Sequence, residues 1–264
     1  MKRNSIKEKL MEIVFLLTAV VSIVAVGLIC FFLFINGFPA FKEIGVWKFL
    51  SGTKWKPTNG IFGIFPMILG SIYVTGGALL IGVPVGILMA IFLARFCPKK
   101  LYKILKPVVD LLAGIPSIVY GFFGLIVLVP FIREHFKGDG NSILTASILL
   151  GIMILPTIIG VSESAIRAVE NTYYEGALAL GATHERSVFT VIVPAAKSGI
   201  MAAVVLGIGR AIGETMAVMM VAGNQARVPD SIFKGVRTLT TNIVMEMGYA
   251  TDLHRQALIA TGVV

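Results

Sequence analysis

Arg210 and Glu214 stand four residues apart inside an apolar stretch that runs from about residue 198 to residue 222. Two side chains at this spacing lie on one face of a helix and can meet. A charged group at membrane depth costs about 2.5 kcal/mol or more, so the pair is expected to face a protein interior or an aqueous path. The planar guanidinium of Arg210 also matches the oxygens of phosphate. We therefore predict that Arg210, Glu214 and the adjacent Thr215 border an anion pathway, with a purely structural ion pair as the alternative.

A second pattern lies in a polar stretch between two apolar blocks. A short helix is expected over 173–180, with small side chains on its surface and with Gly181 as a left-handed stop. Thr183 is expected to cap a second helix, with Glu185 in its first turn. Such an elbow fits a groove on another protein, and an ordinary helical hairpin between spans is the alternative.

Other chemistries find no support in the sequence. His135, His184 and His254 lie in separate loops without metal-ligand spacing. Cys30 lies inside the first apolar block and Cys97 just past the second, so if both blocks span, the two thiols lie near opposite membrane faces, beyond disulfide reach. The chain lacks a glycine-rich loop followed by lysine, so it is not expected to hydrolyse ATP. We predict no catalytic residue, no metal site and no cofactor bound by this chain.

The composition indicates that the elements positioning these residues lie in a bilayer. Of 264 residues, 56% are hydrophobic and 14% are charged, against roughly 25% charged residues in soluble domains. The apolar residues form long blocks, which is typical of membrane-spanning helices. The net charge of +9 is interpreted as membrane orientation and contact with anionic lipid. No basic stripe is interleaved with aromatics, so a nucleic-acid partner is not expected.

The block boundaries predict an all-α integral membrane protein with a cytoplasmic N-terminal segment over 1–12. The segment 36–69, which contains Trp47 and Trp55, is interpreted as external or interfacial. Five positive charges between Arg95 and Lys106 indicate a cytoplasmic loop. Residues 256–264 begin another apolar run that is too short to span, so we predict that the natural protein continues through a sixth span. The five complete spans are expected at about 13–35, 70–94, 111–132, 142–162 and 198–222.

The polar stretch resembles the cytoplasmic signature of permease subunits of ATP-binding-cassette (ABC) importers. That signature is Glu-Ala-Ala, three residues, Gly, nine residues, then Ile-x-Leu-Pro. Here Glu175-Gly176-Ala177, Gly181 and Val191-Ile192-Val193-Pro194 keep both spacings, with small or apolar departures at 176, 191 and 193. The resemblance implies that a coupling segment over 171–194 seats in an ATPase. The coupling residues that it implies are Tyr174, Glu175, Gly176, Ala177, Gly181 and Pro194.

A more specific resemblance includes the segment that contains Arg210 and Glu214. Residues 209–218, 112–121 and Gly223-Asn224 are similar to the C-type permease of phosphate-specific ABC importers. The resemblance implies the type I ABC importer transmembrane fold, with six helices and a permease core over 70–264. It also implies an A-type permease partner, two copies of an ATPase that binds ATP and Mg²⁺, and an external phosphate-binding protein. The implied location is the bacterial inner membrane.

Three alternatives to a phosphate importer subunit stay open. Permeases for sulfate or molybdate share the coupling signature. An ion-driven secondary transporter would usually show repeats with broken helices in matching places, and none is evident. An intramembrane enzyme would need a nucleophile, base or metal constellation among the spans, and one Arg–Glu pair does not supply it.

Overall fold

The computed structural model describes residues 2–136 and 138–264, and these residues are mainly helical, as predicted. The chain divides into two compact units. One unit combines residues 1–64 with residues 245–264, and the other contains residues 65–244. Residues 245–264 thus group with the N-terminal region by their contacts, and the permease core over 70–264 stays a prediction.

The first unit is built around one long helix and a small hairpin. Trp55 lies opposite Phe62 in the antiparallel pair, and their rings meet edge to face. Gly37 allows the long helix to approach the C-terminal helix closely, since a Cβ there would lie 3.1 Å from the Cα of Ala260. The elements are α1 (Lys2–Ile44), α2 (Val46–Ser51), β1 (Trp55–Lys56), the 3₁₀ turn η1 (Pro57–Asn59), β2 (Ile61–Phe62) and α14 (Asp252–Val263).

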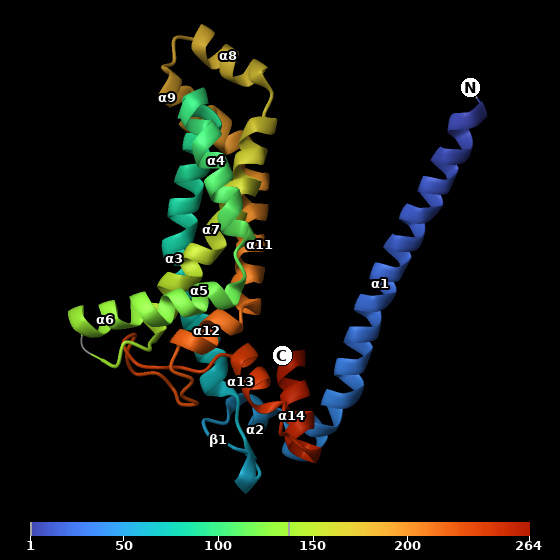
Figure 1. Ribbon diagram of the computed structural model, residues 1–264, viewed down its shortest axis with the longest axis vertical. Helices are drawn as coiled ribbons and strands as arrows, with labels where there is room; N and C mark the ends of the chain where they lie inside the picture. The colour runs from blue at the N-terminus through green and yellow to red at the C-terminus, as the bar shows by residue number, and fades with distance from the viewer. Residues whose placement is uncertain (1, 137) are drawn as a thin grey trace. The chain divides into compact units, whose positions relative to one another are not determined.

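In the second unit, four helices run side by side, and shorter helices lie at each end (Figure 1). The four are α3 (Phe65–Ile91), α4 (Lys99–Gly114), α7 (Ile143–Ala168) and α11 (Lys197–Gly213). At one end lie α8 (Asn171–Ala179) and α9 (His184–Ser187), followed by α10 (Val193–Ala195). At the other end, α5 (Ser117–Phe123), α6 (Val129–His135) and α12 (Met216–Val221) run crosswise, and α13 (Leu239–Glu246) follows.

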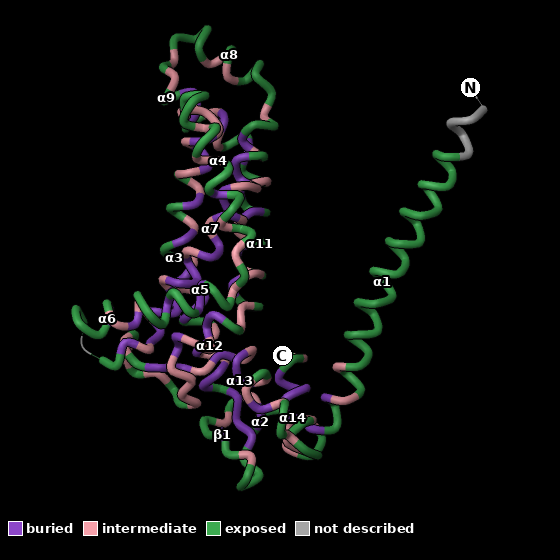
Figure 2. The backbone as a smooth tube through the Cα atoms, in the orientation of Figure 1, coloured by how far each residue is buried: buried purple, intermediate pink, exposed green. Residues whose placement is uncertain are grey.

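The core of this unit is the contact between α3 and α7, where buried residues concentrate (Figure 2). Small residues on α3 let the two helices approach. A Cβ at Gly82 would lie 2.8 Å from Ile154, and one at Gly86 would lie 2.8 Å from Ile158. Both isoleucines are fully buried. A side chain at either glycine would have to displace the facing isoleucine.

Each of the three described π-helical turns ends two residues before a proline. They are η2 (Phe92–Phe96), η3 (Gly124–Leu128) and η4 (Val188–Ile192), which precede Pro98, Pro130 and Pro194. Proline has no N–H, and its ring clashes with the carbonyl four residues earlier. A π-helical turn relieves that clash, because the N–H of the residue before the proline donates to the carbonyl five residues earlier. The Val193 N–H, for example, donates to the Val188 carbonyl.

Four described helical stretches are long and apolar enough to cross a membrane: 7–44, 65–96, 117–135 and 143–168. A fifth crossing is formed if the pair 184–195 and 197–213, bent by 68°, counts as one. The chain is therefore a multi-pass membrane protein. Helices lie at the first, second and fourth predicted spans, and each continues past the predicted C-terminal limit.

The third span was expected at 111–132 with Pro116 and Ser117 interrupting it, but its start was predicted too early, because the helical stretch that can span covers 117–135. Helix α4 ends at Gly114, and the next helix starts at Ser117. Pro116 disfavours helical backbone at Ile115, whose ψ is 126°, and Pro116 itself has ψ of 141°. The positive segment near Lys103 is accordingly a separate helix, α4, rather than a loop.

The fifth span was predicted wrongly as continuous over 198–222. Helix α11 ends at Gly213, Glu214 has extended backbone with ψ of 127°, and α12 starts at Met216. No proline marks this break. Its cause is the Glu214 side chain, described below.

Candidate functional site: an elbow and a charged helix break

The elbow between α7 and α11 has the predicted form. Helix α8 ends at Ala179, and Gly181 has a φ of +85°. Only glycine takes this left-handed conformation without strain. The hydroxyl of Thr183 accepts a hydrogen bond from the Arg186 amide and so caps α9, as predicted. We call residues 171–194 the coupling segment, after the role that the sequence resemblance implies for them.

Two contacts fix the elbow from within. The Tyr174 hydroxyl lies 2.8 Å from Nδ1 of His184, which joins α8 to α9. The His184 ring also meets Phe96, with ring centroids 4.8 Å apart. Because Phe96 is the last residue of η2, the elbow is anchored to the end of the α3 stretch. Tyr174 therefore holds α8 and α9 together within the segment.

The outer surface of the coupling segment is exposed and partly apolar. No residue of α8 is buried, and Glu175 and Gly176 are exposed. Leu180 is 91% exposed and Tyr173 is 57% exposed. A hollow of about 500 Å³ lies on this surface, lined by Tyr173, Ala177, Leu180, Gly181, Ala182, Arg186 and Val191. Exposed apolar side chains that gather beside a hollow, as Leu180 and Tyr173 do here, are typical of a surface that a partner covers.

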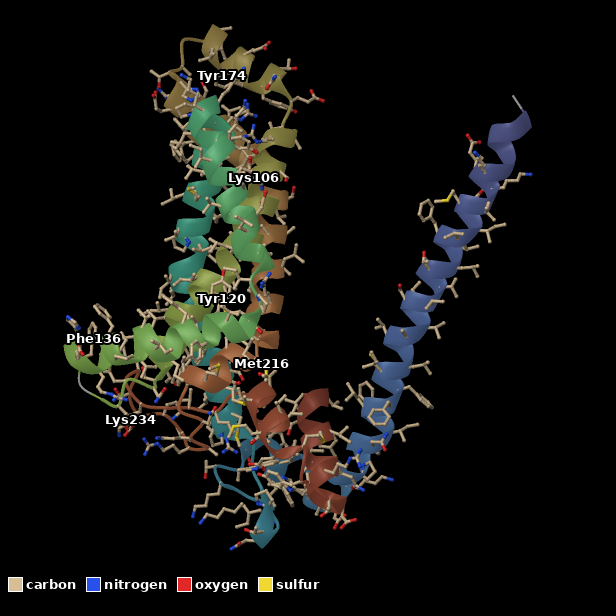
Figure 3. All side chains as sticks on the ribbon, in the orientation of Figure 1. Lys106, Tyr120, Phe136, Tyr174, Met216 and Lys234 are labelled. Carbon is tan, nitrogen blue, oxygen red and sulfur yellow. The ribbon has the colours of Figure 1, made fainter. Side chains whose placement is uncertain are left out.

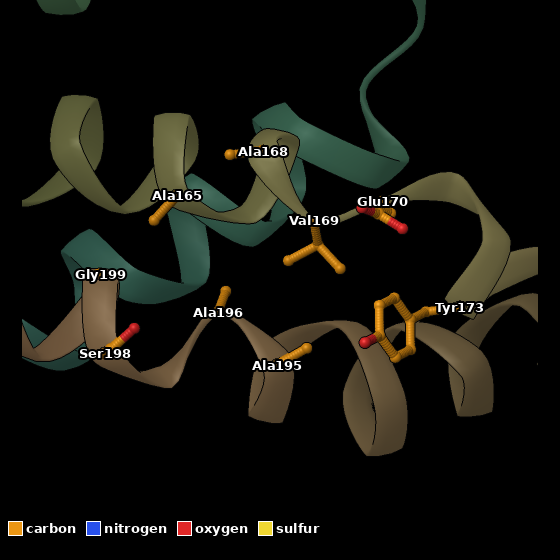
Figure 4. Close-up of a pocket in the computed structure, with 9 residues that line it drawn as sticks. All are labelled: Ala165, Ala168, Val169, Glu170, Tyr173, Ala195, Ala196, Ser198 and Gly199. Carbon is orange, nitrogen blue, oxygen red and sulfur yellow. The ribbon is translucent and has the colours of Figure 1, made fainter.

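A second hollow, of about 560 Å³, lies where α7 and α11 meet the coupling segment (Figure 4). Small residues from α7 and from the start of α11 line much of it, and the Tyr173 ring stands at one end. Gly199 on α11 faces the Ala165 side chain so closely that a Cβ would collide with it. The base of the coupling segment is thus packed through small residues, which makes that packing sensitive to added volume.

Arg210 lies on α11, half-buried, and it does not pair with Glu214. Its Nη1 donates to the Thr157 hydroxyl on α7 over 3.3 Å. Within the described residues this is the one hydrogen bond from its guanidinium, so most of its N–H donors are open to a ligand. The sequence-based expectation that Arg210 and Glu214 meet on one helical face is not met, because the helix ends between them.

Glu214 instead caps the helix that follows. Its Oε1 accepts hydrogen bonds from the backbone N–H groups of Thr215 and Ala217, each at 3.1 Å. A carboxylate at a helix N-terminus satisfies orphan donors and favours the helix dipole. The Thr215 hydroxyl donates to the Gly213 carbonyl at 3.3 Å and is exposed. The three predicted pathway residues therefore cluster at the α11–α12 break, with their side chains in different roles.

Two hydroxyls at this break were not predicted from sequence. Thr157 holds Arg210, and Thr240 donates to the Glu214 carbonyl at 3.2 Å. They lie 53 and 26 residues from those partners. Threonine has no local pattern that marks such a contact, so only the fold reveals it. Gly209 and Gly213 have no neighbour within 4 Å of a built Cβ, so the backbone beside Arg210 is open.

Among the described residues, no three His, Cys, Asp or Glu side chains gather as metal ligands. Cys30 and Cys97 are free. The site is thus a cation and hydroxyls at a helix break, joined through the helices to an exposed elbow. Such a site can bind an oxyanion and pass it on, because the Arg210 guanidinium keeps open hydrogen-bond donors and does not pair with Glu214.

Comparison with known proteins agrees with this geometry. Residues 82–262 match the family model described as binding-protein-dependent transport system inner membrane component. The chain is 45% identical over 239 residues to the probable ABC transporter permease protein YqgH of Bacillus subtilis, covering 88% of this chain and 77% of that protein. It is 35% identical over 267 residues to the phosphate transport system permease protein PstC of Mesorhizobium japonicum, covering 93% and 81%.

Solved structures show the same fold. The MetNI methionine ABC transporter, in an inward-facing conformation, aligns with a TM-score of 0.55 and 21% identity, covering 80% of this chain and 92% of that chain. An amino acid ABC transporter aligns with a TM-score of 0.53 and 18% identity, covering 76% and 85%. These likenesses confirm the predicted type I ABC importer transmembrane fold.

Proposed function

Because the chain belongs to the binding-protein-dependent transport system inner membrane component family, we propose that it is the translocation subunit of an ATP-driven phosphate importer. Several relatives named as phosphate permeases support the substrate, including a probable PstC of Methanocaldococcus jannaschii that is 33% identical over 244 residues. The observation that carries the proposal is the open guanidinium of Arg210, hydrogen-bonded to Thr157 at a break in an apolar helix. A guanidinium offers phosphate paired N–H donors.

In this proposal the present chain does not hydrolyse ATP. An ATPase on a partner subunit binds ATP and Mg²⁺ and receives the coupling segment, chiefly through Glu175, Gly176 and Ala177. The exposure of Leu180 and Tyr173 beside the hollow supports such docking. Gly181 sets the angle of the elbow, Tyr174 clasps it and Pro194 ends it. Two ATPase copies, a homologous A-type permease and an external phosphate-binding protein complete the proposed complex.

In this proposal the complex lies in the bacterial inner membrane with the N-terminus of this chain in the cytoplasm. ATP binding draws the two coupling segments together, and the helices open outward to receive phosphate. Arg210 then holds the anion while Glu214, fixed as the cap of α12, limits how tightly it is held. A pathway must release what it admits.

The test is transport by the reconstituted complex. Proteoliposomes containing this chain, its partner permease and its ATPase should take up radiolabelled phosphate from the binding protein when ATP is supplied. Unlabelled sulfate or molybdate should compete poorly. Strong competition by either oxyanion would reassign the substrate, and uptake that survives ATP removal but collapses with an ionophore would indicate a secondary transporter.

A further inference from the structure

Glu163 is a buried acid near the end of α7, and neither the anion pathway nor the coupling surface accounts for it. Its side chain is 3% exposed. The carboxylate accepts from the Tyr102 hydroxyl and from Arg167 Nε, each at 2.8 Å, and lies 3.5 Å from Lys106 Nζ. A buried charge is tolerated only when it is paired in this way. We call Tyr102, Lys106, Glu163 and Arg167 the Glu163 cluster.

The Glu163 cluster connects three segments of the chain, which are α4, α7 and η2. Tyr102 and Lys106 belong to α4, while Glu163 and Arg167 belong to α7. The Arg167 guanidinium lies 4.7 Å from the Tyr102 ring centroid and donates to the Leu93 carbonyl in η2 at 2.8 Å. Hydrophobic residues of similar volume would hold these helices at least as firmly. The charged cluster adds one defined set of partners for Glu163, which fixes the position of α4 along α7.

One end of this arrangement leads directly to the coupling segment. Helix α7 ends at Ala168, and α8 begins at Asn171. Arg95, in η2, donates to the Ile166 carbonyl at 3.1 Å, within the last turn of α7. A displacement of α8 must therefore act on the end of α7 that holds the Glu163 cluster.

The other end leads to the helix break at Glu214. The Tyr120 hydroxyl on α5 donates to the Leu112 carbonyl on α4 at 2.9 Å, across the interruption between these helices. Gly121 on α5 packs against α12, since a Cβ there would lie 2.9 Å from the Cα of Ala217. The Ala217 amide is one of the two groups that Glu214 caps. Figure 3 shows Tyr174, Lys106, Tyr120 and Met216 at successive positions along this route.

We infer that Glu163 is the positioning residue that makes α4 move with the coupling segment, so that displacement of α8 reaches the Glu214 break through α4, α5 and α12. This inference rests on the proposed function, because it requires an ATPase to move α8. Two experiments measure the movement of the helices and the coupling of uptake to hydrolysis separately from folding.

The first experiment compares uptake with hydrolysis in the reconstituted complex. Glu163→Gln keeps the size of the side chain and removes its charge. Phosphate taken up per ATP hydrolysed should fall about tenfold, while the ATPase rate changes less than about twofold and the amount of assembled complex is unchanged. Asp110→Asn is the matched control, because Asp110 also pairs with Lys106, at 3.0 Å, but is 58% exposed. It should retain normal coupling, since exposed pairs contribute little.

The second experiment measures how α5 moves relative to α8, and it does not depend on transport. Nitroxide labels at Thr172 on α8 and Val119 on α5, both exposed, are placed in a chain with Cys30→Ser and Cys97→Ser. ATP binding should leave their separation nearly constant in the unaltered complex and change it by several ångströms in Glu163→Gln. An unchanged separation in the variant, or proportional loss of uptake, hydrolysis and assembly, would overturn the inference. Failure of the unaltered complex to transport phosphate would refute only the proposed substrate, because the label separation does not depend on it.

Discussion

The Arg210 guanidinium on α11 donates to the Thr157 hydroxyl on α7 over 3.3 Å, and this contact ties the candidate anion ligand to the buried centre of the helix bundle. Thr157 follows Pro156 and precedes Ile158, both of which are buried. The hydroxyl therefore stands on a rigid helix, and it orients Arg210 without neutralising its charge.

Removing the Thr157 hydroxyl should weaken transport without disrupting the fold. Thr157→Val keeps the branched shape and removes the hydrogen bond, whose loss costs about 1 kcal/mol. Phosphate uptake should fall roughly fivefold, measured as initial rates in proteoliposomes. Thr157→Ser, which keeps the hydroxyl, should stay close to the unaltered rate. Equal rates for the valine and serine variants would show that this contact does not position Arg210.

Protein stability should depend less on the charge of Glu214 than on its ability to accept hydrogen bonds at the start of α12. Glu214→Gln retains an oxygen that can accept from the Thr215 and Ala217 amides, whereas Glu214→Leu leaves both unpaired at the start of α12. The leucine variant should lose about 1 kcal/mol of stability, seen as a lower thermal unfolding midpoint than the glutamine variant. If glutamine destabilises as much as leucine, an ionic partner rather than the cap is the main role of Glu214.

Gly181→Ala should strain the elbow, because a side chain at a φ of +85° costs roughly 1–2 kcal/mol. Binding of the ATPase to this chain should weaken about tenfold, measured by titrating labelled ATPase onto the reconstituted permease. Gly160→Ala is the matched control: Gly160 lies within α7, and a Cβ there would meet nothing within 4 Å. Unaltered binding by the Gly181 variant would mean that the elbow angle does not govern docking.

The start of α9 should depend on pH through Glu185. Hydrogen bonds from its own backbone N–H and then from the Thr183 hydroxyl hold the pKa of Glu185 below its ordinary value. Because the folded pKa is the lower one, this stabilisation is complete above the ordinary glutamate pKa and is lost as pH falls through the folded value. Exchange of the Arg186 amide should accelerate over that acidic window relative to the intrinsic rate. Glu185→Gln should abolish the acceleration, and its persistence in that variant would assign it to another group.

Sequence reasoning succeeded where the determinants are local. Gly181, Thr183 and the short helix before them act within a few residues of each other, and the structure confirms all three. The break after Gly213 was missed because its cause is a side chain that reaches forward to backbone amides, and the four-residue spacing of Arg210 and Glu214 suggested a pair instead.

Contacts between distant segments left no trace in the sequence. The bond from Tyr102 to Glu163 joins residues 61 positions apart, and Glu163 fell just outside the fourth span predicted over 142–162, although it is buried in α7. The signal available was its four-residue spacing from Arg167, which also describes an ordinary exposed helix pair. Only the packing of α4 on α7 distinguishes the two cases.

The most direct test of the account is ATP-dependent phosphate uptake by Arg210→Ala beside Lys103→Ala in the reconstituted complex. Both changes remove one cation, but Lys103 is exposed on α4, whereas Arg210 borders the helix break. The account predicts that Arg210→Ala lowers uptake by at least about tenfold with normal assembly, and that Lys103→Ala leaves uptake unchanged. Normal uptake by Arg210→Ala would contradict it.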